Sequence, residues 1–348
     1  MTTAHPDVPA VAVDTPVLEV RDVHVNFAGR QGLIASIMGK TAPSARAVDG
    51  VDFSLAKGEI VALAGESGCG KTTLARAIMG IIKPEKGDVL HEGTSIRTGN
   101  IRDYRRRVQM VFQDPTAALN PRKTVYELVA EGLRVHKVPG NEEEQVASSL
   151  SRAGLRPPER FYLQYPHELS GGQRQRVVIA GALALDPEVI VADEPVSSLD
   201  ASLRGEILKL LMDLRADLQI SILVITHDLG LAWTIADRVV VMYLGRVVES
   251  GPTEDVLLRP MHPYTKALLD VVPEAGGTDR PILQGEPPDP TRIPDGCRFH
   301  LRCPVVASGR AAELGIEDRC RGEDLALREL GEGHLAACYE ADLQYPQS

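Results

Sequence analysis

The sequence predicts an α/β fold in which helices cover both faces of a sheet. Three short apolar runs, ending at Ala64, Ala192 and Ile225, are typical of buried strands. Helical patterns separate these runs, and the clearest one spans 201–218, where apolar residues recur on one face. Strands that alternate with helices are the pattern of an α/β sheet.

The other elements are assigned in chain order. Strands are expected at 18–27, 48–55, 59–64, 108–112, 189–192, 220–225 and 239–248, and a helix at 71–82. Residues 1–16 are expected to form a flexible tail, and 28–46 a loop. Residues 114–186 are predicted to form a helical subdomain. Prolines become frequent beyond 272, which indicates a linker into an extension at 272–348.

Composition excludes several classes of protein. Hydrophobic residues make up 43% of the 348 residues and charged residues 25%, which supports a full core and argues against wholesale disorder. The net charge of −10 disfavours a nucleic-acid partner, because phosphate affinity comes mostly from Lys and Arg. No apolar run approaches the ~18–20 residues that span a bilayer, and no signal peptide is recognised. We therefore expect a cytoplasmic protein whose membrane role, if it has one, comes through partners.

A glycine-rich loop carries the strongest motif. Residues 65–72 fit G-x-x-x-x-G-K-[ST], between an apolar strand and a predicted helix. The glycines let successive N–H groups surround an anion, and the helix N-terminus adds partial positive charge. Lys71 would reach the β- and γ-phosphates, and the Thr72 hydroxyl would bind Mg²⁺. The alternative is a tight turn without a ligand.

Polar residues follow the next two apolar strands. Asp193 and Glu194 end one strand, where an acid can hold Mg²⁺ and a neighbouring carboxylate can polarise water. His227 ends the next strand and would hydrogen-bond a γ-phosphate. The alternatives are that Asp193 and Glu194 are an ordinary acidic strand end and that His227 is a structural histidine. The phosphate loop in the same chain favours a role in binding and hydrolysing a nucleotide.

A fourth motif decides the class. Residues 169–173 read Leu-Ser-Gly-Gly-Gln and precede a predicted helix. Such a segment is either a second anion-binding site at a helix N-terminus or an ordinary capped helix start. The motifs occur in the order phosphate loop, Gln113, LSGGQ, Asp193-Glu194, 197–200 and His227. Together they resemble an ABC-transporter nucleotide-binding subunit, from about residue 17 onward. The resemblance implies a P-loop ATPase domain at 17–271, with a RecA-like core, an antiparallel β subdomain and the helical subdomain.

Other segments resemble the ATPase subunits of oligopeptide and dipeptide importers. They are 112–122, 165–168, 241–246, 262–265, 285–288 and 296–300. The spellings GQRQR and MYLGR are closer to the F-type than to the D-type subunit of such importers.

The resemblance also implies a role for each motif residue. The phosphates of ATP would be bound by Gly65, Glu66, Ser67, Gly68, Cys69, Gly70, Lys71, Thr72 and Thr73. Phe27 would stack on adenine, unless it is an ordinary strand residue. Thr72, Gln113 and Asp193 would contact Mg²⁺, and Glu194, His227 and Gln113 would act in hydrolysis. The opposing subunit's ATP would contact Leu169, Ser170, Gly171, Gly172 and Gln173, and Asp200 would couple the two sites.

The implied partners are a second ABC ATPase subunit of the D-type, two membrane permeases and an extracytoplasmic substrate-binding protein. These partners would place the chain at the cytoplasmic face of the membrane. Peptide is the expected cargo, and nickel, glutathione or sugar importers are alternatives. An ABC-type ATPase acting on nucleic acid is the alternative from another class. It is disfavoured because only one phosphate loop is present and 56 positions separate Gln113 from Leu169, too few for a coiled-coil arm.

Four of the five cysteines lie in the extension. Cys297, Cys303, Cys320 and Cys338 have spacings that match neither a zinc ribbon nor a ferredoxin. Thiols in a cytoplasmic chain favour a metal over disulfides. In some relatives the corresponding cysteines hold a [4Fe–4S] cluster, which is our hypothesis here; free structural thiols are the alternative. About ten extra residues near 309–318 put the third ligand, Cys320, in question.

Overall fold

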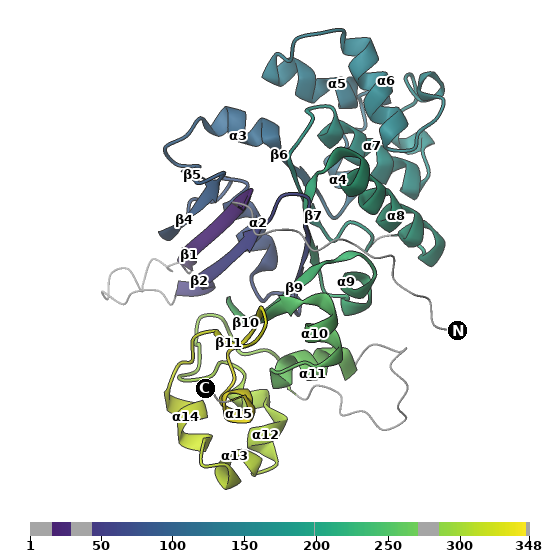
Figure 1. Cartoon of the computed structure of the whole chain (residues 1–348). Helices are drawn as coiled ribbons and strands as arrows, with labels where there is room; N and C mark the ends of the chain where they lie inside the picture. The colour runs from purple at the N-terminus through teal and green to yellow at the C-terminus, as the bar shows by residue number, and fades with distance from the viewer. Residues whose placement is uncertain (1–15, 29–43, 198, 271–284, 346–348) are drawn as a thin grey trace, which may run out of the picture.

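The computed structural model describes residues 16–28, 44–197, 199–270 and 285–345 (Figure 1). Residues 1–15 of the predicted tail, 29–43 of the predicted loop and 271–284 of the predicted linker lie outside this range. Two sheets organise the described chain. One has four strands in the order β2-β1-β4-β5, and the other has eight in the order β11-β12-β10-β9-β3-β8-β7-β6.

The four-stranded sheet is antiparallel. It contains β1 (Leu18–Ala28), β2 (Ser44–Leu55), β4 (Lys86–His91) and β5 (Thr94–Ser95). Val20 pairs with Phe53 of β2 on one side and with Val89 of β4 on the other. The antiparallel β subdomain is thus confirmed, although β2 begins four residues before the predicted strand, within the predicted loop.

The eight-stranded sheet has a parallel centre. β6 (Val108–Val111), β7 (Val189–Asp193), β8 (Ser221–Thr226), β3 (Ile60–Ala64) and β9 (Arg238–Tyr243) run parallel, and β10 (Arg246–Pro252) is antiparallel to β9. β3, β7 and β8 are buried at every position. Because neighbouring strands are parallel, their carboxyl ends meet at one edge of the sheet.

Helices cover this sheet and form a separate lobe. Against the sheet lie α2 (Lys71–Ile78), α8 (Ala201–Leu218) and α9 (Leu229–Ile235). The lobe contains α4 (Pro115–Ala118), α5 (Val125–His136), α6 (Glu142–Arg152) and α7 (Gly171–Leu183), and α3 (Ile101–Arg107) precedes β6. α2 ends four residues earlier than predicted, where Gly80 has a φ of 62°. Figure 1 shows α5 and α6 at one end of the molecule.

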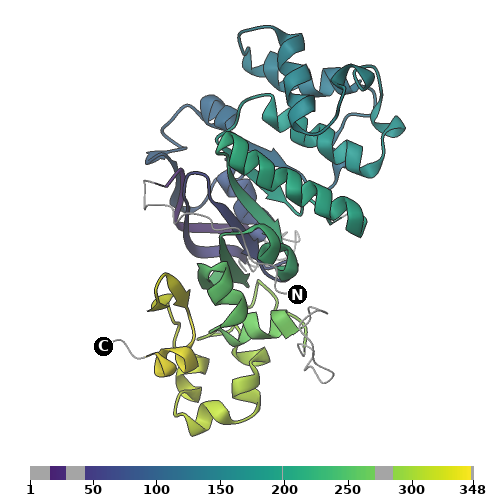
Figure 2. The ribbon, with the colours of Figure 1, turned by 45° about the vertical axis from the view of Figure 1, so that its right-hand side comes forward.

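The described part of the extension joins the large sheet. Residues after α10 (Thr253–Leu258) and α11 (Pro263–Asp270) include α12 (Pro304–Ala307), α13 (Arg310–Glu313), α14 (Glu317–Gly322), β11 (Arg328–Gly331), β12 (His334–Ala336) and α15 (Tyr339–Gln344). β12 pairs with β10 through Glu249 and Ala336. Figure 2 shows this extension at the end of the molecule opposite α5 and α6.

Candidate functional site

The glycine-rich loop lies between β3 and α2, as predicted. Gly65 and Gly70 have φ angles of 150° and 110°. A Cβ on Gly65 would lie 2.2 Å from the Met242 carbonyl oxygen, and one on Gly70 would lie 2.0 Å from the Ala47 carbonyl oxygen. Both positions therefore require glycine for conformation and for space. We call residues 65–73 the phosphate loop.

Lys71 is folded back onto this loop. Its side chain is buried, and its Nζ donates to the carbonyl oxygens of Gly65 at 2.6 Å and Glu66 at 2.9 Å. An ammonium group held at the centre of the loop, next to the N-terminus of α2, makes the loop a site for an anion.

Asp193 supplies a buried carboxylate beside the loop. Burial raises the pKa of Asp193, while hydrogen bonding by the Thr72 hydroxyl and the charge of Lys71 oppose that rise. Its Oδ1 is buried and has no hydrogen-bond partner among the described residues. An unpaired carboxylate oxygen next to a threonine hydroxyl has the donor chemistry that Mg²⁺ prefers. The residues present therefore fit the Mg²⁺ that the sequence predicts.

Three polar side chains meet beside Asp193. Glu194 accepts a hydrogen bond from Gln113 Nε2 at 2.8 Å, and its other carboxylate oxygen lies 3.0 Å from His227 Nδ1. The three residues follow β6, β7 and β8, so the parallel sheet gathers their side chains at one edge. Glu194 has a φ of 45°, and its N–H donates to the Ile225 carbonyl at 2.9 Å. A carboxylate held by an amide and an imidazole is suited to orienting a water molecule.

The Leu-Ser-Gly-Gly-Gln segment, residues 169–173, starts α7. Ser170 caps this helix, because its Oγ accepts from Gln173 N–H at 3.2 Å while the Gln173 side chain accepts from Ser170 N–H at 2.9 Å. Leu169 and Gly172 are buried, and Ser170 and Gly171 are exposed. Within the described chain, no hydrogen bond or ion pair joins this segment to the phosphate loop. The segment is thus a capped helix N-terminus whose Ser170 and Gly171 are exposed.

Two further predicted residues lie at exposed positions. Phe27 is 45% exposed near the end of β1. Asp200 caps α8 by accepting from Leu203 N–H at 3.0 Å, which lowers the pKa of its carboxyl.

Two family profiles match the chain. The one described as ABC transporter matches residues 48–197, and the one described as oligopeptide/dipeptide transporter, C-terminal region, matches residues 248–309. The oligopeptide transport ATP-binding protein AppF of Bacillus subtilis is 41% identical over 93% of this chain and 97% of its own. The dipeptide transport ATP-binding protein DppF of Haemophilus influenzae is 41% identical over 95% of this chain and 99% of its own.

The chain belongs to the ABC transporter ATP-binding family. Solved structures agree with this assignment. The cbiO1 protein of Clostridium perfringens, part of an ABC transporter complex, superposes with a TM-score of 0.60 at 31% identity, over 71% of this chain and 92% of its own. A dimer of the ATP-binding cassette MJ0796 bound to ADP and Pi superposes with a TM-score of 0.58 at 28% identity, over 68% of this chain and 98% of its own. The activity of this ABC ATPase is transport-coupled ATP hydrolysis. Among its described helices, none has the length and apolar character needed to cross a bilayer.

Sequence reasoning missed a contact between the extension and the phosphate loop of this ABC ATPase. Arg302, whose side chain is 5% exposed, donates to both carboxylate oxygens of Glu66 at 2.7 and 3.0 Å. The Tyr264 hydroxyl accepts from Glu66 N–H at 2.8 Å. The two partners of the ion pair are 236 positions apart, so no local pattern signals it.

The four cysteines of the extension line one cavity. It has a volume of about 20 Å³, and Phe299, Ile316 and Tyr339 complete much of its wall. The extra residues near 309–318 form α13 and lead into α14, and Cys297 N–H donates to the Cys320 carbonyl at 2.9 Å. The structure therefore brings Cys320 to the other three cysteines despite the insertion. We call this space the cysteine cavity.

Burial governs the chemistry of these thiols. It raises the pKa of Cys297 and of Cys338 to about 12, and raises the pKa of Cys303 and Cys320 as well. No three of the four sulfurs lie within 4.8 Å of one another. A single tetrahedral zinc would hold its sulfurs about 3.8 Å apart, from Zn–S bonds of about 2.3 Å.

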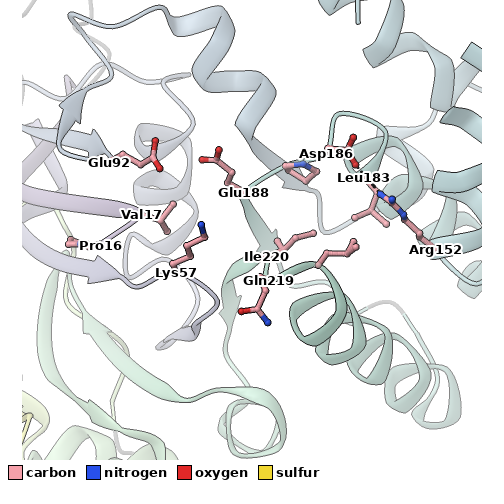
Figure 3. A pocket seen from close by; sticks show the side chains of 12 residues that line it. Pro16, Val17, Lys57, Glu92, Arg152, Leu183, Asp186, Glu188, Gln219 and Ile220 are labelled. Atoms are coloured by element: carbon pink, nitrogen blue, oxygen red, sulfur yellow. Dashed lines mark hydrogen bonds and ion pairs between the residues drawn. The ribbon is translucent and has the colours of Figure 1, made fainter. Parts of the chain in front are cut away.

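A separate cavity of about 460 Å³ lies at the other end of the parallel strands (Figure 3). Glu188 and Ile220 line it and directly precede β7 and β8, whereas Glu194 and His227 directly follow these strands. Lys57 and Arg152 add positive charge to its wall. None of the predicted site residues lines this cavity.

Proposed function

We propose that this ABC ATPase binds Mg·ATP at its phosphate loop and hydrolyses it to drive peptide import across the cytoplasmic membrane. The hydrogen-bonded group of Gln113, Glu194 and His227 beside Asp193 carries the proposal. In this proposal the group would supply an acceptor for the proton of an attacking water, next to the residues that would hold magnesium. The cargo rests on the relatives, which are described as oligopeptide and dipeptide transport proteins.

Each site residue takes one role in this proposal. Residues 65–73 bind the phosphates, Phe27 stacks on the adenine, and Thr72, Gln113 and Asp193 hold Mg²⁺. Glu194 is the general base, and His227 hydrogen-bonds the γ-phosphate. When bound, the metal neutralises charge on the phosphate oxygens.

The second half of the proposal concerns partners. Residues 169–173 contact ATP bound by an opposing ABC ATPase subunit, which we propose is the D-type paralogue, and Asp200 couples the two sites. The exposure of Ser170 and Gly171 supports this arrangement, and so does the dimer of MJ0796. Two permeases and an extracytoplasmic binding protein complete the importer and hold the subunit at the cytoplasmic face of the membrane. We assign the ATPase domain to 17–271, its helical subdomain to 114–186 and the extension to 272–348.

Transport by the reconstituted importer tests the function and the cargo together. Membrane vesicles containing both ATPase subunits and both permeases are given the binding protein, ATP and labelled dipeptide, nickel or glutathione. We expect ATP-dependent uptake of the peptide and none with Glu194→Gln. Uptake of nickel or glutathione instead would refute the cargo, and ATP-independent uptake would refute the energising role.

For the cysteine cavity, we propose a [4Fe–4S] cluster bound by Cys297, Cys303, Cys320 and Cys338. The shared cavity and the separated sulfurs support the proposal, whereas the small volume requires its walls to move apart on loading. Protein purified without oxygen should contain about four irons per chain and absorb visible light, and Cys320→Ser should lose both. Protein without iron, in which the serine variant changes nothing, would favour structural thiols.

A further inference from the structure

The ion pair between Arg302 and Glu66 connects the extension to the phosphate loop. Glu66 is the second residue of that loop, and its carbonyl oxygen accepts from Lys71 Nζ at 2.9 Å. Its N–H is held by Tyr264, and its carboxylate is held at both oxygens by Arg302. One loop residue is therefore fixed through its backbone and its side chain by residues at least 198 positions away.

Arg302 is itself held in place by packing. Its guanidinium lies 5.9 Å from the ring centroid of Tyr243 and donates to the Tyr243 hydroxyl at 3.5 Å. Tyr243, Tyr264 and Phe299 form an aromatic group with centroid separations of 4.6 to 5.3 Å. Burial lowers the pKa of Arg302, but Glu66 and Tyr243 together outweigh this and leave the pKa raised, so the side chain stays charged.

The charge balance at the loop gives this contact a consequence for nucleotide binding. Glu66 places a negative charge in the loop that surrounds the phosphates of a polyanion. Paired with Arg302, that charge is neutralised, because the guanidinium donates to both carboxylate oxygens. Without Arg302, the carboxylate would be unpaired, free to turn toward the phosphates and repel them.

We propose that Arg302 is a positioning residue for nucleotide binding, which holds the phosphate loop open to ATP by neutralising and orienting Glu66. The proposal rests on the assignment of residues 65–73 as the nucleotide site. It makes the extension part of the ATP-binding apparatus, although no extension residue is required to touch the nucleotide. Cys303, the next residue, lines the cysteine cavity, so the same backbone joins that cavity to the loop.

Nucleotide titrations of charge variants test the proposal. Arg302→Ala should raise the Kd for Mg·ATP, and the KM, by about tenfold while kcat changes less than about twofold, because the partly buried Glu66 carboxylate loses its partner. The double variant Glu66→Gln with Arg302→Ala should recover most of the affinity, because it removes the unpaired charge. A role limited to folding predicts no such recovery. Arg310→Ala is the control. It breaks another ion pair of the extension, in which Arg310 Nε lies 2.9 Å from a Glu340 carboxylate oxygen, and it should leave the Kd unchanged.

Other results would overturn the inference. They are an unchanged Kd in folded Arg302→Ala, a double variant that binds no better than the single one, or an equal loss in Arg310→Ala. If Arg302→Ala does not fold, Arg302→Lys provides the test. Lysine keeps the positive charge but cannot bridge both carboxylate oxygens of Glu66, so we expect the Kd for Mg·ATP to rise about threefold. An unchanged Kd would refute the proposal. Wild-type protein that binds no nucleotide would instead refute the assignment of the site itself.

Discussion

At the scale of single residues, local sequence was sufficient to find the phosphate loop and the strand-end side chains. Glycine at 65 and 70 is required by backbone conformation, which acts within the loop itself, and by the close approach of the Met242 and Ala47 carbonyl oxygens, which the fold supplies. Glu194 and His227 were found because each follows an apolar strand. Their contact through Glu194 Oε1 depends on strand order, which a linear pattern does not contain.

Glu194→Gln tests the catalytic assignment at this scale. The amide cannot take a proton from water, so we expect phosphate release to fall by about 10²- to 10³-fold while ATP binding is retained. Single-turnover hydrolysis and nucleotide titration measure the two effects separately. Glu206→Gln, which changes an exposed glutamate of α8 that pairs with Arg176, is the matched control and should hydrolyse normally. Wild-type rates in Glu194→Gln would remove Glu194 from the role of base.

At the scale of elements, the strength of the hydrophobic pattern decided what the sequence predicted. The helix predicted at 201–218 was found with the same bounds, because its apolar face is long and regular. β4, β5 and α3 were missed. β4 reads Lys-Gly-Asp-Val-Leu-His, a short and only partly buried strand whose glycine and two charged residues do not give a strand pattern. β11 and β12 were missed for a related reason. They have four and three residues, and they are stabilised by the pairing of β12 with β10 and of β11 with β12.

The cap of α7 provides a prediction for an element. Ser170→Ala removes the side-chain acceptor of Gln173 N–H, so we expect a loss of about 1 kcal/mol in unfolding free energy and weaker ATP-dependent dimerisation. Urea unfolding and light scattering with ATP in the Glu194→Gln background measure the two effects.

A cap elsewhere in the same lobe controls for stability. Asn141→Ala removes the cap of α6, where the side chain accepts from Glu143 N–H at 3.1 Å. It should cost a similar free energy of unfolding and leave dimerisation unchanged. If the two variants dimerise equally well, residues 169–173 do not form the partner contact.

At the scale of the whole molecule, buried polar groups attach the extension to the core. Glu249 is fully buried and accepts from the N–H groups of Met261 and His262 at 2.7 and 3.0 Å. Its Oε1 also lies 2.7 Å from His334 Nε2 on β12. A buried carboxylate needs several such partners, so β10, α11 and the extension are stabilised together.

This buried network predicts a pH dependence of stability. Burial lowers the pKa of His262 to about 4, well below the 6.5 of an exposed histidine. Between these values the unfolded chain takes up a proton that the folded chain does not, so stability falls as the pH is lowered from 6.5 toward 4. Each pH unit within this window costs about 1.4 kcal/mol from this group.

Urea unfolding at pH 7 and pH 5 measures this effect. His262→Asn retains an acceptor for Tyr264 N–H and should show a smaller loss between the two pH values than the wild type. His167→Asn changes an exposed histidine and should behave as the wild type. An equal loss in all three proteins would show that His262 does not titrate in this window.

The sequence by itself determined the family, the phosphate loop, the strand-end residues and most of the core elements, because each depends on chemistry within a few neighbouring positions. Only the tertiary structure decided the sheet order that gathers Gln113, Glu194 and His227, the convergence of four cysteines on one cavity, and the pairing of Arg302 with Glu66. Glu194 and His227 are 33 positions apart, and Arg302 and Glu66 are 236 positions apart. These contacts form because the order of the strands and the packing of the extension bring distant parts of the chain together, and no periodicity in the chain records which distant groups will meet.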